Sequence, residues 1–145
     1  MLLARAGHNV LVVDRVEFPS DTWSTHFITA PGTSLLKRWG VLDPLLAKGV
    51  PLFDRVNLIT PTMEMSSADL LGPAFVVSPR RTDLDLTLVE QAIAAGAEVR
   101  TNVTVTELMH DASGRVTGVT LRDAEGNMSE ERGDRKGGGA GEGVG

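Results

Sequence analysis

Residues 9–15 read NVLVVDR, an apolar run that ends in an acidic and a basic residue. Residues 10–13 are a short apolar run rich in β-branched side chains, which is typical of a parallel strand covered on both faces. The preceding residues, up to Gly7, form the last turn of a helix. A strand that follows a helix and carries Asp14 at its carboxyl end matches the second strand of a dinucleotide-binding βαβ unit, where an acid binds the nucleotide ribose. The alternative is an ordinary α/β strand that ends in a polar residue.

The glycine-rich turn of such a unit is missing upstream. A G-x-G-x-x-G turn that cradles the pyrophosphate lies roughly 20 residues before the acid. Asp14 stands too close to Met1 to leave room for this turn and for the strand before it. We therefore expect a chain that starts late, as a fragment would.

The composition restricts the classes of function. At 145 residues the chain has the length of one ordinary domain, and 41% hydrophobic residues are enough for a core. A formal net charge of −5 and the absence of a Lys/Arg block argue against nucleic-acid binding. The absence of cysteine excludes disulfides, thiolate catalysis and zinc–sulfur sites.

Other sequence signals are absent as well. No apolar run approaches the about 18 residues of a membrane span, and the first residues do not form a signal peptide. We expect no membrane span and take the cytoplasm as the default compartment. No carboxylate pair, Ser-His-Asp set or His-rich spacing supports a hydrolase or a metal site, and no segment indicates a protein partner.

Two short helices are predicted after a long loop over residues 16–32. Thr33 can cap a helix over residues 34–39. Asp43 is the expected N-cap of the next helix, with Pro44 at its first position. A glycine ends each helix.

A longer helix begins near residue 82. Thr82 and Asp85 resemble a capping box, although the pattern prefers Glu or Gln at the third position. Gly96 ends this helix, and residues 97–100 form a short strand. The apolar stripe of the predicted helix consists of Leu84, Leu88 and Ala92. Because helix, glycine and strand repeat the order seen at the N-terminus, we expect two such units to enter one sheet.

The remaining strands are read from alternation. Residues 55–60 and 74–78 are strand-like. Residues 101–108 and 115–122 alternate on both sides of a turn at residues 111–114, which predicts an antiparallel ribbon.

The C-terminal segment has a different composition. Residues 129–145 are rich in glycine and have almost no large apolar side chains. Such a segment cannot build a core, and we expect a disordered Gly-rich tail. The predicted domain organisation is thus a partial domain over residues 1–128 followed by this tail. A strand that would return to the sheet is expected where the tail stands, which suggests a broken gene boundary near Gly133.

In order, these segments resemble the flavoprotein monooxygenase and reductase group with the p-hydroxybenzoate hydroxylase-type FAD fold, whose relatives include geranylgeranyl reductases and flavin-dependent halogenases. The matching sequences are LLARAGHNVLVVDR, FPSDTWSTHFITAPGTSLLKRWGVLD, SPRRTDLD and AGAEVRTNVTVTEL with its RVTGV ribbon. Each piece is weak alone, but their order over residues 1–122 is specific. The resemblance implies an α/β fold, namely a partial FAD/NAD(P)-binding Rossmann-like domain with an antiparallel β ribbon and without the first βα turn.

The resemblance also implies an FAD site. Asp14 corresponds to the acid that holds the adenosine ribose hydroxyls, and Arg15 to its neighbour beside the adenine. Arg81 corresponds to the arginine of the R-x-x-L helix start that reaches the phosphate–ribose part of FAD, where a planar, charged guanidinium suits a pyrophosphate. Val105 corresponds to the residue whose main chain meets the adenine edge.

Each assignment has an alternative. Asp14 can be a solvated residue at a strand end. Arg81 can be an ordinary surface arginine, in which case Arg80 takes its role. Val105 can be a residue that only packs in the core. His26, with Ser24 and Thr25, falls in the loop that runs toward the isoalloxazine in the family. It is the one catalytic candidate, as a general acid or base, or else an ordinary loop histidine. His8 and His110 are expected at the surface.

The expected function is the FAD-binding portion of a flavin-dependent oxidoreductase. The resemblance favours a monooxygenase that acts on a small organic substrate, with NAD(P)H as the electron donor of the intact parent. One alternative is a truncated remnant without catalysis, and another is an FAD-dependent reductase or dehydrogenase of the same fold. Since the glycine turn and the later Gly-Asp motif are missing, we expect the fragment itself to be inactive.

Overall fold

The computed structural model describes residues 1–21, 23, 27–54, 57–66 and 76–133. Its centre is a parallel pair of strands, β1 (Leu11–Val13) and β6 (Glu98–Arg100), in which Val12 lies opposite Val99. Helix α1 (Leu2–Arg5) precedes β1, and helix α5 (Arg81–Ala94) precedes β6. The two predicted helix-to-strand units therefore enter one sheet, as expected.

Strand β1 is less buried than its apolar sequence predicts. All of its residues are half-buried rather than buried. A cavity of about 990 Å³ runs along Val10, Leu11 and Val13 and opens one side of the strand. The expectation of a strand covered on both faces is therefore wrong for the described residues.

The hydrophobic core lies beside the parallel pair, where α5 meets α2 (Ala30–Arg38) and α3 (Leu42–Ala47). Its buried side chains come from α2, from α3 and the residues that flank it, and from the short strand β5 (Val76–Val77). They are Leu36, Val41, Leu42, Leu45, Val50 and Val77. Leu84 and Leu88 of the predicted stripe on α5 pack against this cluster, and Ala92 is buried.

The starts of α2 and α3 differ from the expectation. Helix α2 begins at Ala30, because Pro31 suits the first turn and Thr29 takes the N-cap position. Thr33 lies inside the helix, where its hydroxyl donates to the carbonyl of Ile28 at 3.3 Å. Asp43 likewise lies within the first turn of α3 instead of capping it.

A three-stranded antiparallel sheet follows β6, in the order β7 (Thr104–His110), β8 (Val116–Arg122) and β9 (Met128–Arg132). The predicted ribbon is the β7–β8 pair. The expected disorder from residue 129 is wrong for Ser129 to Arg132, since these residues belong to β9 and pair with β8. The rest of the predicted tail, residues 134–145, lies outside the described residues.

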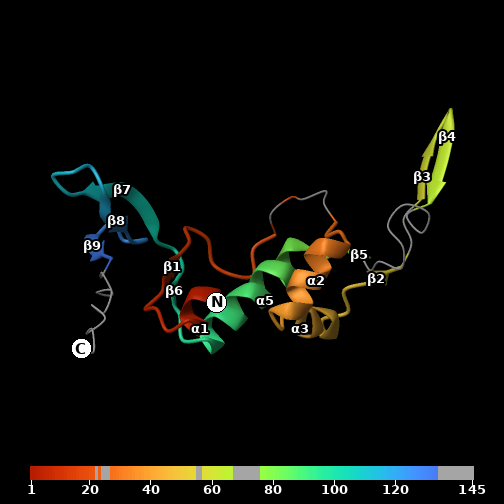
Figure 1. The fold of residues 1–145 in the computed structure, drawn as a ribbon. Helices are drawn as coiled ribbons and strands as arrows, with labels where there is room; N and C mark the ends of the chain where they lie inside the picture. The colour runs from red at the N-terminus through yellow and green to blue at the C-terminus, as the bar shows by residue number, and fades with distance from the viewer. Residues whose placement is uncertain (22, 24–26, 55–56, 67–75, 134–145) are drawn as a thin grey trace, which may run out of the picture.

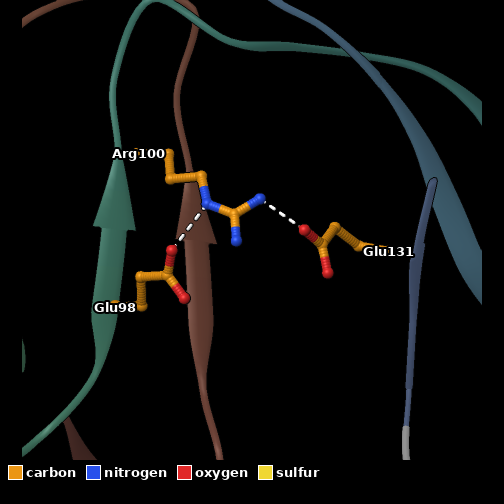
Figure 2. Close-up of polar contacts among 3 residues, drawn as sticks. All are labelled: Glu98, Arg100 and Glu131. Carbon is orange, nitrogen blue, oxygen red and sulfur yellow. Dashed lines mark hydrogen bonds and ion pairs between the residues drawn. The ribbon is translucent and has the colours of Figure 1, made fainter. Parts of the chain in front are cut away.

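A partly exposed cluster of ion pairs connects β6 to the three-stranded sheet (Figure 2). The Arg100 Nε donates to Glu98 on the same strand at 2.6 Å, and its Nη1 donates to Glu131 of β9. These hydrogen bonds raise the pKa of Arg100. The bond to Glu98 has the larger effect, and the bond to Glu131 has the next largest. The Arg100–Glu131 pair is thus a side-chain contact between β6 and the three-stranded sheet.

The other strands extend away from the core. Strand β2 (Leu52–Phe53) pairs with β5, and β3 (Asn57–Thr60) pairs with β4 (Met63–Ser66) as a hairpin. Figure 1 shows an elongated molecule with the β7–β8–β9 sheet at one end and the β3–β4 hairpin at the other. Within the described ranges, no helix has the length and apolar character needed to cross a membrane.

Candidate functional site

A cavity of about 420 Å³ lies between the carboxyl end of β1 and the first turns of α5. Its volume falls in the range of small-molecule sites, roughly 300–1,000 Å³. The strand end and the loop after it supply one wall, and α5 supplies the other. The lining residues are Asp14, Arg15, Val16, Phe18, Ser20, Arg81, Asp85, Leu88 and Val89. Three of the four predicted cofactor-binding residues therefore line the same cavity.

Asp14 is held by its main chain on both sides. Its N–H donates to the carbonyl of Arg100 at 3.0 Å, and its carbonyl accepts from the N–H of Val103 at 3.0 Å. Asn102 makes this second bond possible, because its φ of 59° turns the chain back after β6 and asparagine tolerates that conformation.

Only one oxygen of the Asp14 carboxylate accepts a hydrogen bond from the described residues. Its Oδ1 accepts from the N–H of Val16 at 2.9 Å, which forms an Asx turn at the end of the strand. Among the residues that the structure describes, the Oδ2 has no hydrogen-bond partner. This half-buried oxygen is available to hydroxyl groups of a molecule in the cavity.

Arg81 is the first residue of α5, so the predicted capping box is wrong. The N-cap is Arg80, which makes no side-chain cap bond, and Thr82 lies within the helix. Instead of capping, the Asp85 carboxylate accepts two hydrogen bonds from the Arg81 Nε, at 2.9 and 2.8 Å. The Arg81 Nη2 lies 2.7 Å from Oδ2 of Asp85. The hydrogen bond to Asp85 and then its charge raise the pKa of Arg81.

The loop after β1 borders the cavity on the side opposite α5. Arg15 is exposed and lines the cavity together with Ser20. The loop is attached by Asp21, whose Oδ2 accepts from the Nη2 of Arg80 at 2.6 Å. Arg80 is therefore engaged outside the cavity, and Arg81 is the arginine that lines it.

Val105 lies elsewhere. It is in β7, is exposed, and lines the 990 Å³ cavity between β1 and the β8–β9 strands. The pairing of β7 with β8 shifts between Val105 and Glu107, so a β-bulge distorts the ladder there. The structure does not bring Val105 into the cavity of Asp14 and Arg81.

The catalytic candidate His26, with Ser24 and Thr25, lies outside the described residues. His8 and His110 are exposed, as predicted. Nowhere in the described part of the chain do three or more His, Cys, Asp or Glu side chains gather as metal ligands.

Sequence reasoning missed Asp85 as a site residue. The signal was present, because residues at i and i+4 meet on one helix face, and an acid four residues after an arginine forms an ion pair there. Asp85 is only 17% exposed and lines the cavity beside Arg81.

The arrangement suits a ligand with hydroxyl and anionic groups. A carboxylate oxygen accepts from hydroxyls, and a guanidinium at a helix N-terminus attracts phosphate oxygens. A cavity at the carboxyl end of a parallel strand that is preceded by a helix is typical of dinucleotide-binding α/β proteins.

The family comparison agrees with this class. The family described as "FAD binding domain" matches residues 1–131, and the chain belongs to this family. Its cofactor is FAD, which confirms the predicted cofactor and the resemblance stated from the sequence.

Among curated proteins, the chain is similar to the menaquinone reductase of Mycolicibacterium smegmatis, with 31% identity over 120 residues. The match covers 83% of this chain and 29% of that protein. The chain thus spans less than a third of the length of this relative.

Solved structures share the fold. A flavoprotein/dehydrogenase from Cytophaga hutchinsonii has a TM-score of 0.75 at 21% identity, over 90% of this chain and 33% of its own. The myxobacterial chondrochloren halogenase CndH, an FAD-dependent halogenase, has a TM-score of 0.74 at 20% identity, and the match covers 89% of this chain and 31% of CndH. PqsL, a probable FAD-dependent monooxygenase from Pseudomonas aeruginosa, has a TM-score of 0.69 at 14% identity, and the match covers 88% of this chain and 35% of PqsL. The predicted Rossmann-like α/β fold with an antiparallel ribbon is confirmed.

Proposed function

We propose that the 420 Å³ cavity holds the adenosine and diphosphate part of FAD. The observation that carries this proposal is the convergence of Asp14 and Arg81 on one cavity, although they stand far apart in the sequence. The Asp14 Oδ2 would accept hydrogen bonds from the ribose hydroxyls. Arg81, at the N-terminus of α5, would donate to the diphosphate.

Two further residues would complete the contact. Arg15 lines the same cavity and is exposed, which allows its guanidinium to lie against the adenine. The main chain of Val105, next to the bulge in β7, would meet the adenine edge only if the base extends from one cavity toward the other. Val105 is therefore the least supported of the four assignments.

Titration of the 145-residue chain with FAD, followed by flavin fluorescence, tests the proposal. We expect Asp14→Asn and Arg81→Lys each to weaken binding by roughly tenfold, as the loss of one charge-assisted hydrogen bond does. Asp14→Asn keeps an oxygen for the Asx turn, and Arg81→Lys keeps the charge but loses the planar fork.

Arg80→Lys is the matched control, because the neighbouring Arg80 pairs with Asp21 outside the cavity. Equal FAD affinity of the wild type, Asp14→Asn and Arg81→Lys would contradict the proposal. A larger loss for Arg80→Lys than for Arg81→Lys would reassign the phosphate contact to Arg80.

For the whole protein we propose a cytoplasmic flavin-dependent oxidoreductase with a small organic substrate and NAD(P)H as the electron donor. When bound, the flavin ring supplies the redox chemistry, while the protein supplies placement and electrostatics. The sequence resemblance favours a monooxygenase. The 31% identity to a menaquinone reductase supports a reductase as the second candidate.

Oxygen dependence separates the two candidates. A monooxygenase loaded with FAD consumes oxygen as it oxidises NAD(P)H in the presence of its substrate. A reductase oxidises NAD(P)H without oxygen when an acceptor such as a quinone is supplied. Turnover by this chain alone would contradict the expectation that the fragment is inactive.

A further inference from the structure

We infer that Asp85 is a positioning residue for the cofactor, which acts by fixing the guanidinium of Arg81 with one of its two donor edges toward the cavity. This inference rests on the proposed function of Arg81. Asp85 itself carries a negative charge and would not contact the diphosphate.

The hydrogen bonds to Asp85 occupy one edge of the guanidinium. A guanidinium offers two donor pairs, one formed by Nε with Nη2 and one formed by Nη1 with Nη2. Asp85 takes the first pair, at 2.8–2.9 Å from Nε and 2.7 Å from Nη2. The edge formed by Nη1 and the second hydrogen of Nη2 has no partner among the described residues and can bind two oxygens of a phosphate at once.

The position of the pair on α5 keeps this geometry fixed. Arg81 and Asp85 are four residues apart and thus on the same helix face. The Asp85 side chain is 17% exposed and that of Arg81 is 34% exposed, so the pair is partly shielded from water. A free arginine would have to lose its rotamer entropy on binding, whereas Arg81 is already ordered.

An opposite effect of Asp85 is also conceivable, since its charge repels an anion. Arg15 and Arg81 balance the charges of Asp14 and Asp85 around the cavity, so the lining is neutral overall. Repulsion would make removal of the Asp85 charge strengthen binding, while positioning makes the same change weaken it. The sign of the effect therefore distinguishes the two roles.

The experiment is a double-mutant cycle on FAD affinity in the 145-residue chain. We expect Asp85→Asn to weaken binding by about five- to tenfold when Arg81 is present and by less than about twofold in the Arg81→Lys background, because lysine has no second edge to orient. Asp83→Asn is the matched control, since Asp83 carries the same charge on the first turn of α5 and does not line the cavity. We expect its affinity within about twofold of the wild type.

A second readout tests the geometry without cofactor. The NMR signal of the Arg81 Nε–H should exchange slowly with water in the free protein and become fast in Asp85→Asn, while Asp83→Asn leaves it slow. Fast exchange in the wild type would overturn the inference, even if the Asp85 variant proves unstable.

The outcomes separate this inference from the function on which it rests. Unchanged or tighter FAD binding by Asp85→Asn, or equal weakening in both backgrounds, overturns the positioning role alone. Equal FAD affinity of the wild type and Arg81→Lys overturns the proposed contact of Arg81 and with it the inference.

Discussion

The carboxylate of Asp111 organises the turn between β7 and β8. It accepts hydrogen bonds from the hydroxyl and the N–H of Ser113 and from the N–H of Arg115. These bonds, that of the Ser113 hydroxyl first, lower the pKa of Asp111 below its usual range. The charged carboxylate is therefore favoured more in the folded than in the unfolded chain.

A pH dependence of stability follows. The contribution of Asp111 is complete above the unfolded pKa of about 3.9 and is lost as the pH falls through the lower, folded pKa. We expect Asp111→Ala to lower the free energy of unfolding at pH 6 but not below the folded pKa, as measured by urea denaturation. An equal loss at pH 6 and at pH 2.5 would contradict this account.

Gly118 provides a second test at the level of a single residue. It is buried in the central strand β8, and a Cβ there would collide with the carbonyl oxygen of Glu131 and lie 3.1 Å from the Cα of Arg132. Because the obstacle is the backbone of β9, we expect Gly118→Ala to destabilise the fold by about 1–3 kcal/mol in denaturant unfolding. At Gly133 the nearest atom would be 3.8 Å away, so Gly133→Ala should be neutral. Equal effects of both substitutions would contradict the argument.

The sequence pointed to Asp14, Arg15 and Arg81, which line one cavity in the structure, but it did not reveal the partners of their side chains. Asp14 follows from the position of an acid after an apolar strand, a local signal. Thr82 and Asp85 were read as a capping box, but the nearest strong donor to the Asp85 carboxylate is the Arg81 side chain. Spacing alone could not decide between these two local partners.

An ion pair between Arg100 and Glu131 links β6 to β9 (Figure 2). Arg100 and Glu131 are each 36% exposed, so water screens their attraction. We expect a double-mutant cycle of Arg100→Met and Glu131→Gln to give only a small coupling free energy in urea unfolding, because both side chains are partly exposed. A coupling as large as that of a buried ion pair would contradict this expectation.

Prediction from sequence succeeded for elements with a clear period and failed at their boundaries. The alternation in β7 and β8 was sufficient to predict the antiparallel ribbon, and the helix–glycine–strand order was sufficient to predict the parallel pair of β1 and β6. Strand β9 was missed because four of its five residues are exposed and its sequence, MSEER, has almost no apolar pattern. Its formation depends on main-chain pairing with β8, a partner that alternation within β9 does not reveal.

In the molecule as a whole, the core of α2, α3 and α5 supports one wall of the 420 Å³ cavity, because Leu88 packs on the core cluster and also lines the cavity.

Leu45 is fully buried in this core cluster, and we expect Leu45→Ala to lower the free energy of unfolding by about 2–5 kcal/mol in denaturant unfolding. Leu35 on α2 is 42% exposed, and Leu35→Ala should cost less than about 1 kcal/mol. A smaller loss at Leu45 than at Leu35 would place the core elsewhere.

The whole fold could be predicted only through the order of many weak motifs. Each helix or strand is compatible with several folds, but their order over residues 1–122 resembles one family, whose model matches residues 1–131. The two cavities could not be predicted, because they depend on how the parallel pair sits against α5 and against the three-stranded sheet.

NMR mapping of FAD binding on the ¹⁵N-labelled chain tests whether FAD occupies the cavity lined by Asp14 and Arg81. If FAD binds as proposed, the largest amide shifts surround the 420 Å³ cavity, from Asp14 to Ser20 and along the first two turns of α5. Shifts confined to the other cavity, at His8, Asn9 and Arg115 to Val119, or no shifts at saturating FAD, would contradict the assignment of Asp14 and Arg81 to the cofactor.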